Sequence, residues 1–287
     1  MVLVELSCLC NNACVFCSQA EERCNGARQV DDASVQAALQ SARGEVVAVV
    51  GGEPSLDPRL ASIAERARQL GAQAIVIQTN GRRLAYARYA AELAGAGVTC
   101  LEVSLQGSSA AMHDYHTSVP GSFGQTIRGI ANAVAAGMSV VVTTVVTRSN
   151  LRHLSEIARV VHTLGARALR LRRVRLVGRA LELQQRLLPA AVLAAPHLQQ
   201  ARRVGDQLGI PVYFEVAADP APGFVDFVGG SEPHEAEETA LLRDTKAALS
   251  TERARPALAE NRGRDRLSGD ALREILPELF GPAQGER

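Results

Sequence analysis

Short apolar runs alternate along the chain with longer segments in which apolar residues recur every three or four positions. Apolar runs rich in Val and Ile predict strands, and the three-to-four spacing predicts amphipathic helices. The predicted strands are residues 2–7, 45–50, 73–81, 98–107, 140–146, 166–174 and 210–216. The predicted helices are residues 31–42, 58–70, 84–95, 123–136, 151–164 and a last helix around 185–208, and residues 108–121 are expected to form a loop.

This repeated order of strand and helix predicts an α/β fold with a parallel sheet and right-handed crossovers. Six such units and a last strand, without a sharp break in composition, favour one partial (β/α)6 TIM-like barrel over residues 1–217. A doubly wound sheet of the Rossmann type is the structural alternative. Residues 218–231 are rich in Pro and Gly, and residues 232–267 are rich in charge with little pattern. Residues 218–287 are therefore expected to be a C-terminal extension, either partly disordered or packed across one barrel end.

Composition and charge narrow the function classes. Of the 287 residues, 47% are hydrophobic and 21% charged, which is typical of a soluble globular protein, and the formal net charge is +1. Nothing global therefore indicates a nucleic-acid partner or an anionic membrane surface, and no apolar run approaches the roughly 20 residues that span a bilayer. The N-terminal stretch MVLVELSCLC has no basic leader or small-residue cleavage site, so no signal peptide is expected and the cytoplasm is the predicted location.

The cysteines are concentrated at the start of the chain. They occupy positions 8, 10, 14, 17, 24 and 100. A disulfide framework spreads along a small secreted chain, whereas clustered thiols in a large reduced protein more often bind metal or do redox chemistry. Cys10, Cys14 and Cys17 form a C-x3-C-x2-C element directly after the first predicted strand, while Cys24 and Cys100 are expected to be structural.

Two metal sites are compatible with this spacing. The three cysteines can reach three irons of a [4Fe–4S] cluster and leave the fourth iron without a protein thiolate. Zinc is the competing metal, with Cys8 as a fourth ligand in a closed tetrahedral site. Cys8 and Cys10 are only two positions apart, a cramped pair for one ion, so the cluster is favoured.

Polar, glycine-bearing segments follow the next three strands. GGEP (51–54) comes after the second strand, QTNG (78–81) after the third and SLQG (104–107) after the fourth. In β/α barrels the ends of neighbouring strands meet at one rim, where the chemistry is concentrated. The cysteine element follows the first strand, so one ligand at this rim would contact all four segments.

The element CNNACVFC, with an aromatic residue before its last cysteine, and the GGEP segment resemble the radical S-adenosylmethionine (radical SAM) enzymes. The resemblance extends over roughly residues 2–216. It implies that Cys10, Cys14 and Cys17 ligate one [4Fe–4S] cluster. The amino and carboxylate groups of S-adenosylmethionine (SAM) would chelate the open iron of that cluster.

For SAM itself, the resemblance implies a binding site in the rim segments. Gly51, Gly52, Glu53 and Pro54 would meet the methionyl amino group, since a carboxylate favours an amine and glycine lets backbone carbonyls approach. Phe16 would pack near the adenine. The ribose hydroxyls or the SAM carboxylate would be bound by further polar side chains, namely Ser104, Asn80 and Thr143.

The reaction that the resemblance implies is reductive cleavage of SAM to methionine and a 5′-deoxyadenosyl radical, which removes hydrogen from a small-molecule or peptide substrate. An electron donor such as flavodoxin or ferredoxin is then required. The sequence has no cysteine after Cys100, so auxiliary clusters in a cysteine-rich C-terminal domain are not expected. A non-catalytic or regulatory iron–sulfur protein with the same fold is the alternative function, and a zinc-stabilised binding protein is a weaker one.

Alternation along the predicted strands places charged side chains inside the barrel. Arg170 and Arg172 face the interior if the leucines beside them face the helices, and the same alternation applies to residues 98–107. The candidate substrate residues are therefore Glu102, Gln106, Arg170 and Arg172. The alternative is a buried network in which Glu5, Glu102, Arg170 and Arg172 neutralise one another.

The segment HDYHT (113–117) lies in the long loop expected after the fourth strand. An Asp–His pair is able to act as a general base. Helix capping and hydrogen bonds within the loop are the favoured roles for these residues.

Overall fold

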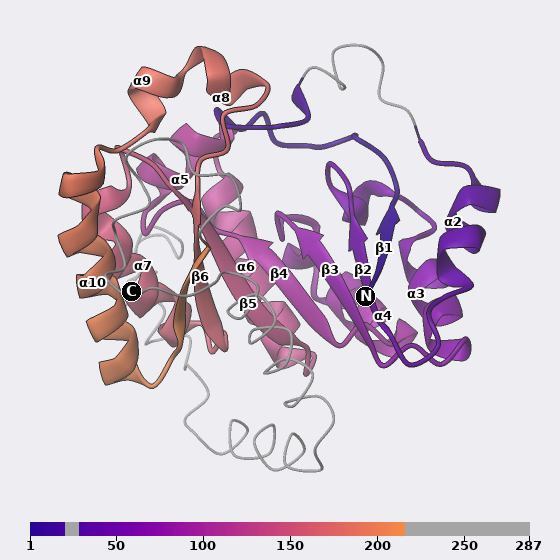
Figure 1. The fold of residues 1–287 in the computed structure, drawn as a ribbon. Helices are drawn as coiled ribbons and strands as arrows, with labels where there is room; N and C mark the ends of the chain where they lie inside the picture. Colours follow the sequence, from indigo (N-terminus) through magenta and orange to yellow (C-terminus); the bar gives the residue numbers. More distant parts are fainter. Residues whose placement is uncertain (21–28, 216–287) are drawn as a thin grey trace, which may run out of the picture.

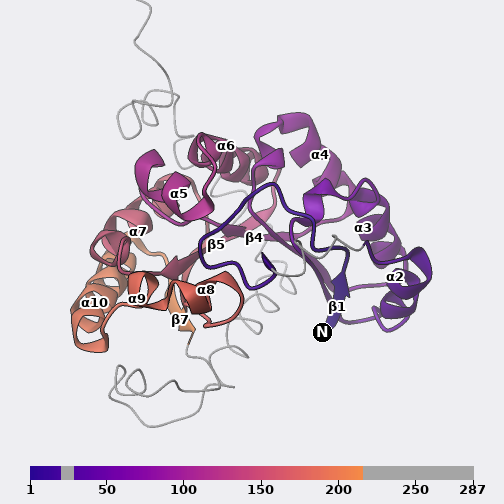
Figure 2. The same cartoon turned by 90° about the horizontal axis from the view of Figure 1, so that it is seen from above.

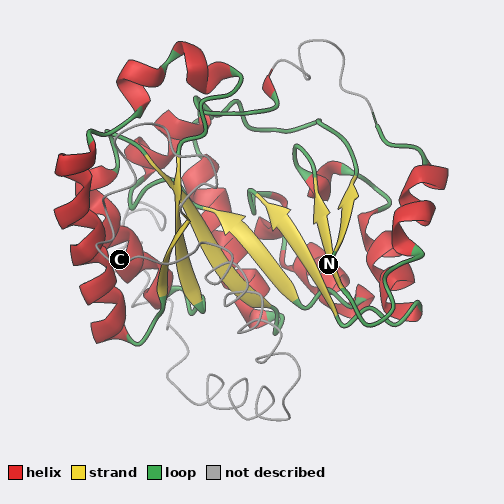
Figure 3. Cartoon of the chain, viewed as in Figure 1, coloured by secondary structure: helices red, strands yellow, loops and turns green. Residues whose placement is uncertain are grey.

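The computed structural model describes residues 1–20 and 29–215, so Cys24 and the expected C-terminal extension lie outside the described residues. Within these ranges, parallel strands form one sheet in the order of the chain (Figures 1 and 3). The strands are β1 (Val2–Glu5), β2 (Val46–Val50), β3 (Ala74–Thr79), β4 (Cys100–Ser104), β5 (Ser139–Val146), β6 (Ala168–Arg173) and β7 (Val212–Glu215).

The helices alternate with the strands, and the longer ones form an arc outside the curved sheet (Figure 2). They are α2 (Asp32–Leu39), α3 (Leu60–Gln69), α4 (Ala87–Ala96), α5 (Ala110–Thr117), α6 (Ser122–Ala135), α7 (Leu154–Thr163), α8 (Arg179–Glu182), α9 (Gln184–Leu187) and α10 (Ala191–Leu208), with 3-10 turns η1 (Pro54–Leu56), η2 (Arg83–Ala85) and η3 (Leu151–His153). None of the helices in the described ranges is long and apolar enough to cross a bilayer.

The order of the strands decides between the two predicted topologies. Each strand pairs in parallel with the next one along the chain, from β1 at one end of the sheet to β7 at the other. A doubly wound sheet reverses its strand order at a switch point, and this sheet does not. The α/β partial barrel is therefore confirmed, and the Rossmann-type alternative is wrong.

The side of the sheet toward the helices is apolar, as the alternation predicts. Leu101 and Val103 on β4 and Leu169 on β6 have no exposed surface and belong to the main hydrophobic core. The intervening Glu102 and Arg170 lie on the opposite face, where each side chain is 13% exposed. The predicted phase of both strands is confirmed.

The segment between β4 and α6 is helical where a loop was expected. Residues 110–117 form α5, and the Ser109 side chain caps its first turn by accepting a hydrogen bond from Met112 N. Gly107 lets the chain turn closely into α5, because a Cβ there would lie 2.7 Å from the Met112 side chain. The weak apolar periodicity of AAMHDYHT hides this helix from a pattern-based prediction.

The last predicted helix is divided in two. Leu188 ends α9 in an extended conformation, with φ −74° and ψ 119°, and α10 begins at Ala191. Pro189 explains the break, because a proline has no N–H to donate and disfavours the helical conformation of the residue before it. The prediction of one helix around 185–208 was wrong at its start.

Asp114, from the HDYHT segment, caps helix α6. Its carboxylate accepts hydrogen bonds from Gly121 N at 2.6 Å, Ser122 Oγ at 2.8 Å and Phe123 N at 2.8 Å. Burial alone would raise the pKa of this carboxyl, but the hydrogen bonds from Phe123, Ser122 and Gly121 outweigh it and lower the pKa. The capping role predicted for HDYHT is thus confirmed for Asp114.

We expect Asp114→Ala to lower the free energy of unfolding by about 1–2 kcal/mol at pH 7. Because the folded-state pKa is depressed, the carboxylate stabilises the fold fully above its ordinary pKa, near 4, and less as the pH falls through the folded pKa. The difference in the free energy of unfolding between wild type and variant should therefore become smaller below about pH 4. Urea unfolding at pH 7 and at pH 3 measures both values, and an equal gap at both would contradict capping by the ionised carboxylate.

Candidate functional site

The residues that follow β1 cross the carboxyl ends of the strands. This segment, residues 8–20, is called the cysteine loop here; it runs from β1 across the open face of the sheet toward α8 (Figures 1 and 2). Its position matches the rim where the sequence predicts a shared ligand. Cys10, Cys14 and Cys17 all lie on this loop, and each is partly exposed.

The cysteine loop passes directly over GGEP. Gly52 N donates to Ser7 O at 2.6 Å, and Glu53 N donates to Leu9 O at 2.7 Å. Gly51 has a φ of +142°, and a Cβ at Gly52 would lie 2.3 Å from Leu9 O. Only glycine fits such a backbone-to-backbone crossing, so the two glycines bring the loop against the end of β2.

Glu53 is a buried acceptor at the centre of the rim. Its side chain is 1% exposed. One carboxylate oxygen accepts from Ser55 N at 3.0 Å and Thr79 Oγ1 at 2.6 Å, and the other accepts from Asn80 N at 2.6 Å. The glutamate therefore ties the end of β2 to the end of β3, and both of its oxygens already have protein donors.

Helix α5 and the start of α8 hold the far part of the cysteine loop. Ala13 N donates to Thr117 O and Val15 N to His116 O, both at 2.9 Å. Arg179 donates to Ala13 O at 2.8 Å. A Cβ at Gly178 would lie 2.8 Å from Cys17 O. The loop therefore bridges β1 and the residues that follow β6.

Phe16 packs into a small hydrophobic cluster under α8 and α9. The buried members of this cluster are Val174, Ala180 and Leu187. The Phe16 ring also lies 6.0 Å from the ring of His116. Burial lowers the pKa of His116, so the imidazole is neutral at pH 7; its Nδ1 donates to Met112 O at 2.7 Å, and its Nε2 accepts from Thr147 Oγ1 at 2.8 Å.

The thiols differ in their surroundings. Cys10 Sγ accepts a hydrogen bond from Asn12 N at 3.4 Å and lies 3.9 Å from Asn80 Nδ2. Cys8 is buried beside Gly52. Cys100 is buried within β4, and burial raises the pKa of its thiol to about 12, so it is protonated at neutral pH. Among the cysteines that the structure describes, the partly exposed thiols are thus those of the C-x3-C-x2-C element.

In the ranges 1–20 and 29–215, no three Cys, His, Asp or Glu side chains are arranged around one metal-ion position. A closed zinc site with Cys8 therefore has no preassembled ligand set in this part of the chain. A [4Fe–4S] cluster places different demands on a loop, because each cysteine binds its own iron. Three partly exposed thiols on one loop, with amide donors near Cys10 Sγ, fit such a cluster.

The interior face of the sheet carries a charged network around Glu102. Its carboxylate accepts from Gln78 Nε2 at 3.0 Å, Thr143 Oγ1 at 2.8 Å and Arg170 at 3.2 Å, and Arg172 lies 4.0 Å away. The predicted neutralising network is confirmed for Glu102, Arg170 and Arg172. It is wrong for Glu5, which is exposed and accepts from Gln19 Nε2 at 3.3 Å. Ser104 is paired in register with Thr143, next to this network.

Gln106 is separate from that network. The strand β4 ends at Ser104, so the alternation that predicts an inward Gln106 no longer applies to it. Gln106 is 3% exposed, and its Oε1 accepts from Val145 N at 2.9 Å. The structure therefore does not bring Gln106 together with Glu102 and the arginines.

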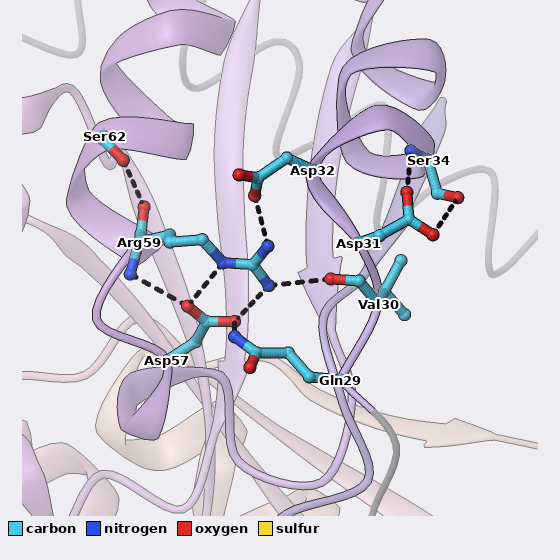
Figure 4. Close-up of polar contacts among 8 residues, drawn as sticks. All are labelled: Gln29, Val30, Asp31, Asp32, Ser34, Asp57, Arg59 and Ser62. Atoms are coloured by element: carbon cyan, nitrogen blue, oxygen red, sulfur yellow. Dashed lines mark hydrogen bonds and ion pairs between the residues drawn. The ribbon is translucent and has the colours of Figure 1, made fainter.

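An ion-pair cluster centred on Arg59 lies between the start of α2 and the turn that follows GGEP (Figure 4). Arg59 donates to Asp57 at 2.8 Å, to Val30 O at 3.0 Å and to Asp32, while Gln29 donates to Asp57 at 3.3 Å. Burial opposes ionisation of Asp57, but the hydrogen bonds from Arg59 outweigh it and lower the pKa. This cluster joins the residues before α2 to the turn that follows GGEP.

Comparison with known families identifies the group of proteins to which this chain is related. Residues 4–161, more than half of the chain, match the Radical SAM superfamily. This chain belongs to the radical SAM superfamily. The match confirms the family predicted from the cysteine element and GGEP. The enzymes of this superfamily use a [4Fe–4S] cluster and SAM.

Curated relatives of this radical SAM protein are longer than the chain. The AdoMet-dependent heme synthase of Oleidesulfovibrio alaskensis is 32% identical over 145 residues, which are 50% of this chain and 37% of the synthase. The PqqA peptide cyclase of Ruegeria pomeroyi is 30% identical over 192 residues, which are 66% of this chain and 51% of the cyclase. The chain therefore spans about half the length of these relatives or less.

A solved structure supports the fold. Streptococcus suis SuiB bound to S-adenosylmethionine superposes with a TM-score of 0.62, covering 81% of this chain and 53% of SuiB. The sequence identity is 16%, so the likeness concerns the fold alone.

Some residues that hold the site have no sequence signal. Arg82 donates to Asn11 O and to Asn12 Oδ1, and its Nε donates to Gln125 Oε1 at 2.6 Å. Arg179 holds the other part of the cysteine loop. Arginines are common on this chain, so only the contacts distinguish these two from the rest.

Proposed function

We propose that this chain is a single-cluster radical SAM enzyme in which Cys10, Cys14 and Cys17 ligate the [4Fe–4S] cluster. The observation that carries this proposal is the backbone crossing of the cysteine loop over GGEP, with Glu53 N bonded to Leu9 O at 2.7 Å. The crossing brings the start of the cysteine loop, just before Cys10, against the GGEP backbone. A cluster and a ligand bound to it would require that proximity.

When bound, the cluster supplies the electron that cleaves SAM to methionine and a 5′-deoxyadenosyl radical, which abstracts hydrogen from the substrate. The residues of this chain would bind SAM and orient it. Gly51, Gly52 and Pro54 would present backbone to the methionyl amino group, and Glu53 would add negative charge beside that amine. Phe16 would limit the space around the adenine.

Polar side chains further along the sheet complete the proposed SAM and substrate sites. Ser104 and Thr143 are neighbours on β4 and β5 and are proposed to face SAM. Glu102 and Arg170 lie beside them and are proposed to face the substrate, with the arginine available to a carboxylate. Thr143 Oγ1 already donates to Glu102, so binding at either site would rearrange the same network.

The proposed substrate is a small molecule or a peptide. The relatives support both classes, since one is named a heme synthase and another a peptide cyclase. An electron donor such as a flavodoxin or a ferredoxin is proposed as the partner that reduces the cluster.

Anaerobic reconstitution with iron and sulfide, followed by SAM and dithionite, tests the proposal. We expect about four irons per chain and formation of 5′-deoxyadenosine. Stoichiometric zinc without a cluster would contradict it. A cluster that forms no 5′-deoxyadenosine with SAM and dithionite would instead support the regulatory alternative.

A further inference from the structure

Asn80 lies where three segments of the rim meet. It follows β3 and is 7% exposed. Its N–H donates to Glu53 Oε2 at 2.6 Å, and its carbonyl accepts from Thr126 Oγ1 at 2.9 Å. Its main chain is therefore fixed between the GGEP segment and helix α6.

The side-chain amide of Asn80 points the other way, toward the cysteine loop. Its Nδ2 donates to Asn11 Oδ1 at 2.6 Å and lies 3.9 Å from Cys10 Sγ. Its Oδ1 accepts from Arg82 N at 3.0 Å. If the amide were flipped, its NH2 group would face the N–H of Arg82, and two donors would meet. The hydrogen-bond network therefore places the NH2 group on the side of the Cys10 sulfur.

We propose that Asn80 is a positioning residue for the cluster, which holds the Cys10 end of the cysteine loop and directs an N–H dipole at the Cys10 sulfur. This role would take the place of the contact with SAM that the resemblance implies for Asn80. The proposal rests on the proposed function in one respect, the ligation of the cluster by Cys10.

The physical consequence concerns the reduction of the cluster. A reduced cluster carries one more negative charge than the oxidised form, and part of that charge resides on its sulfur ligands. An N–H group directed at a ligating sulfur stabilises that charge, so hydrogen bonds of this kind raise the reduction potential. Because the same residue holds Glu53 through its main chain, the cluster side and the GGEP side of the rim share one anchor.

The test is an EPR-monitored potentiometric titration of the reconstituted protein without SAM. For Asn80→Ala we expect the ratio of reduced to oxidised cluster at a fixed potential to fall by about tenfold, which is about 59 mV for a one-electron couple. Asn80→Asp keeps the shape and replaces the donor by a charged acceptor, so its ratio should fall further. Asn80→Asp also carries the test alone if Asn80→Ala does not fold.

Asn132→Ala is the matched control. Asn132 lies on α6, and its Nδ2 donates to Leu84 O at 2.9 Å and to Ala85 O at 3.0 Å. These two carbonyls belong to the connection between β3 and α4, which also contains Asn80. This variant removes an amide of the same kind that bonds backbone carbonyls instead of the cysteine loop. Its potential should equal that of the wild type.

The outcomes separate this inference from the proposed function. A wild-type chain without a [4Fe–4S] cluster would refute the proposed function. A wild-type cluster with an unchanged potential in both Asn80 variants would overturn the positioning role alone. An unchanged potential with weaker SAM binding would do the same, and would return Asn80 to the SAM site.

Discussion

We expect Cys14→Ala to lose the brown iron–sulfur chromophore. Two cysteines in place of three leave a second iron without a protein thiolate, and the loop offers no replacement, because Cys8 is buried beside Gly52. Bound iron should fall from about four per chain to below about one, and formation of 5′-deoxyadenosine should fall by more than about 100-fold. Iron and sulfide analysis, the visible absorption spectrum and product quantification measure these losses.

The control for this variant is Cys100→Ala. Cys100 is buried in β4, and its thiol pKa of about 12 keeps it protonated. We expect this variant to keep the full iron content, with a modest loss of stability from the small cavity. A retained cluster in Cys14→Ala, or a lost one in a folded Cys100→Ala, would refute the assignment of the ligands.

Gly52→Ala is expected to disrupt the crossing of the cysteine loop over GGEP. The added Cβ would lie 2.3 Å from Leu9 O and 2.4 Å from Cys8 O, and both are backbone atoms that cannot move aside as a flexible side chain would. We expect the free energy of unfolding to fall by about 3 kcal/mol. Cluster content after reconstitution should fall as well, because the loop that carries the cysteines must shift. Urea unfolding and iron analysis measure the two effects.

Gly95→Ala provides the comparison for that variant. Gly95 lies within α4, and nothing is within 4 Å of the position that its Cβ would occupy. Alanine is the better helix former, so this change should stabilise the protein by up to about 1 kcal/mol. If the two variants had the same stability and iron content, the tight crossing at Gly52 would not matter to the site.

Several features of the fold could be predicted because they depend on local spacing. Alternation along β4 and β6 places Leu101 and Leu169 against the helices and Glu102 and Arg170 on the other face. Two errors arose where local signals are weak or compete. Helix α5 has little apolar periodicity, and Pro189 interrupts an otherwise helical pattern.

The sequence by itself determined the family, the order of the elements and the candidate residues for the chemistry. These properties follow from residues close together in the chain, such as the three cysteines and GGEP. Only the tertiary structure decided which residues hold them. Asn80 meets Cys10 across 70 positions, and Arg179 meets Ala13 across 166. Such contacts depend on how neighbouring strands pair and on where the connecting loops cross, and no local spacing encodes either one.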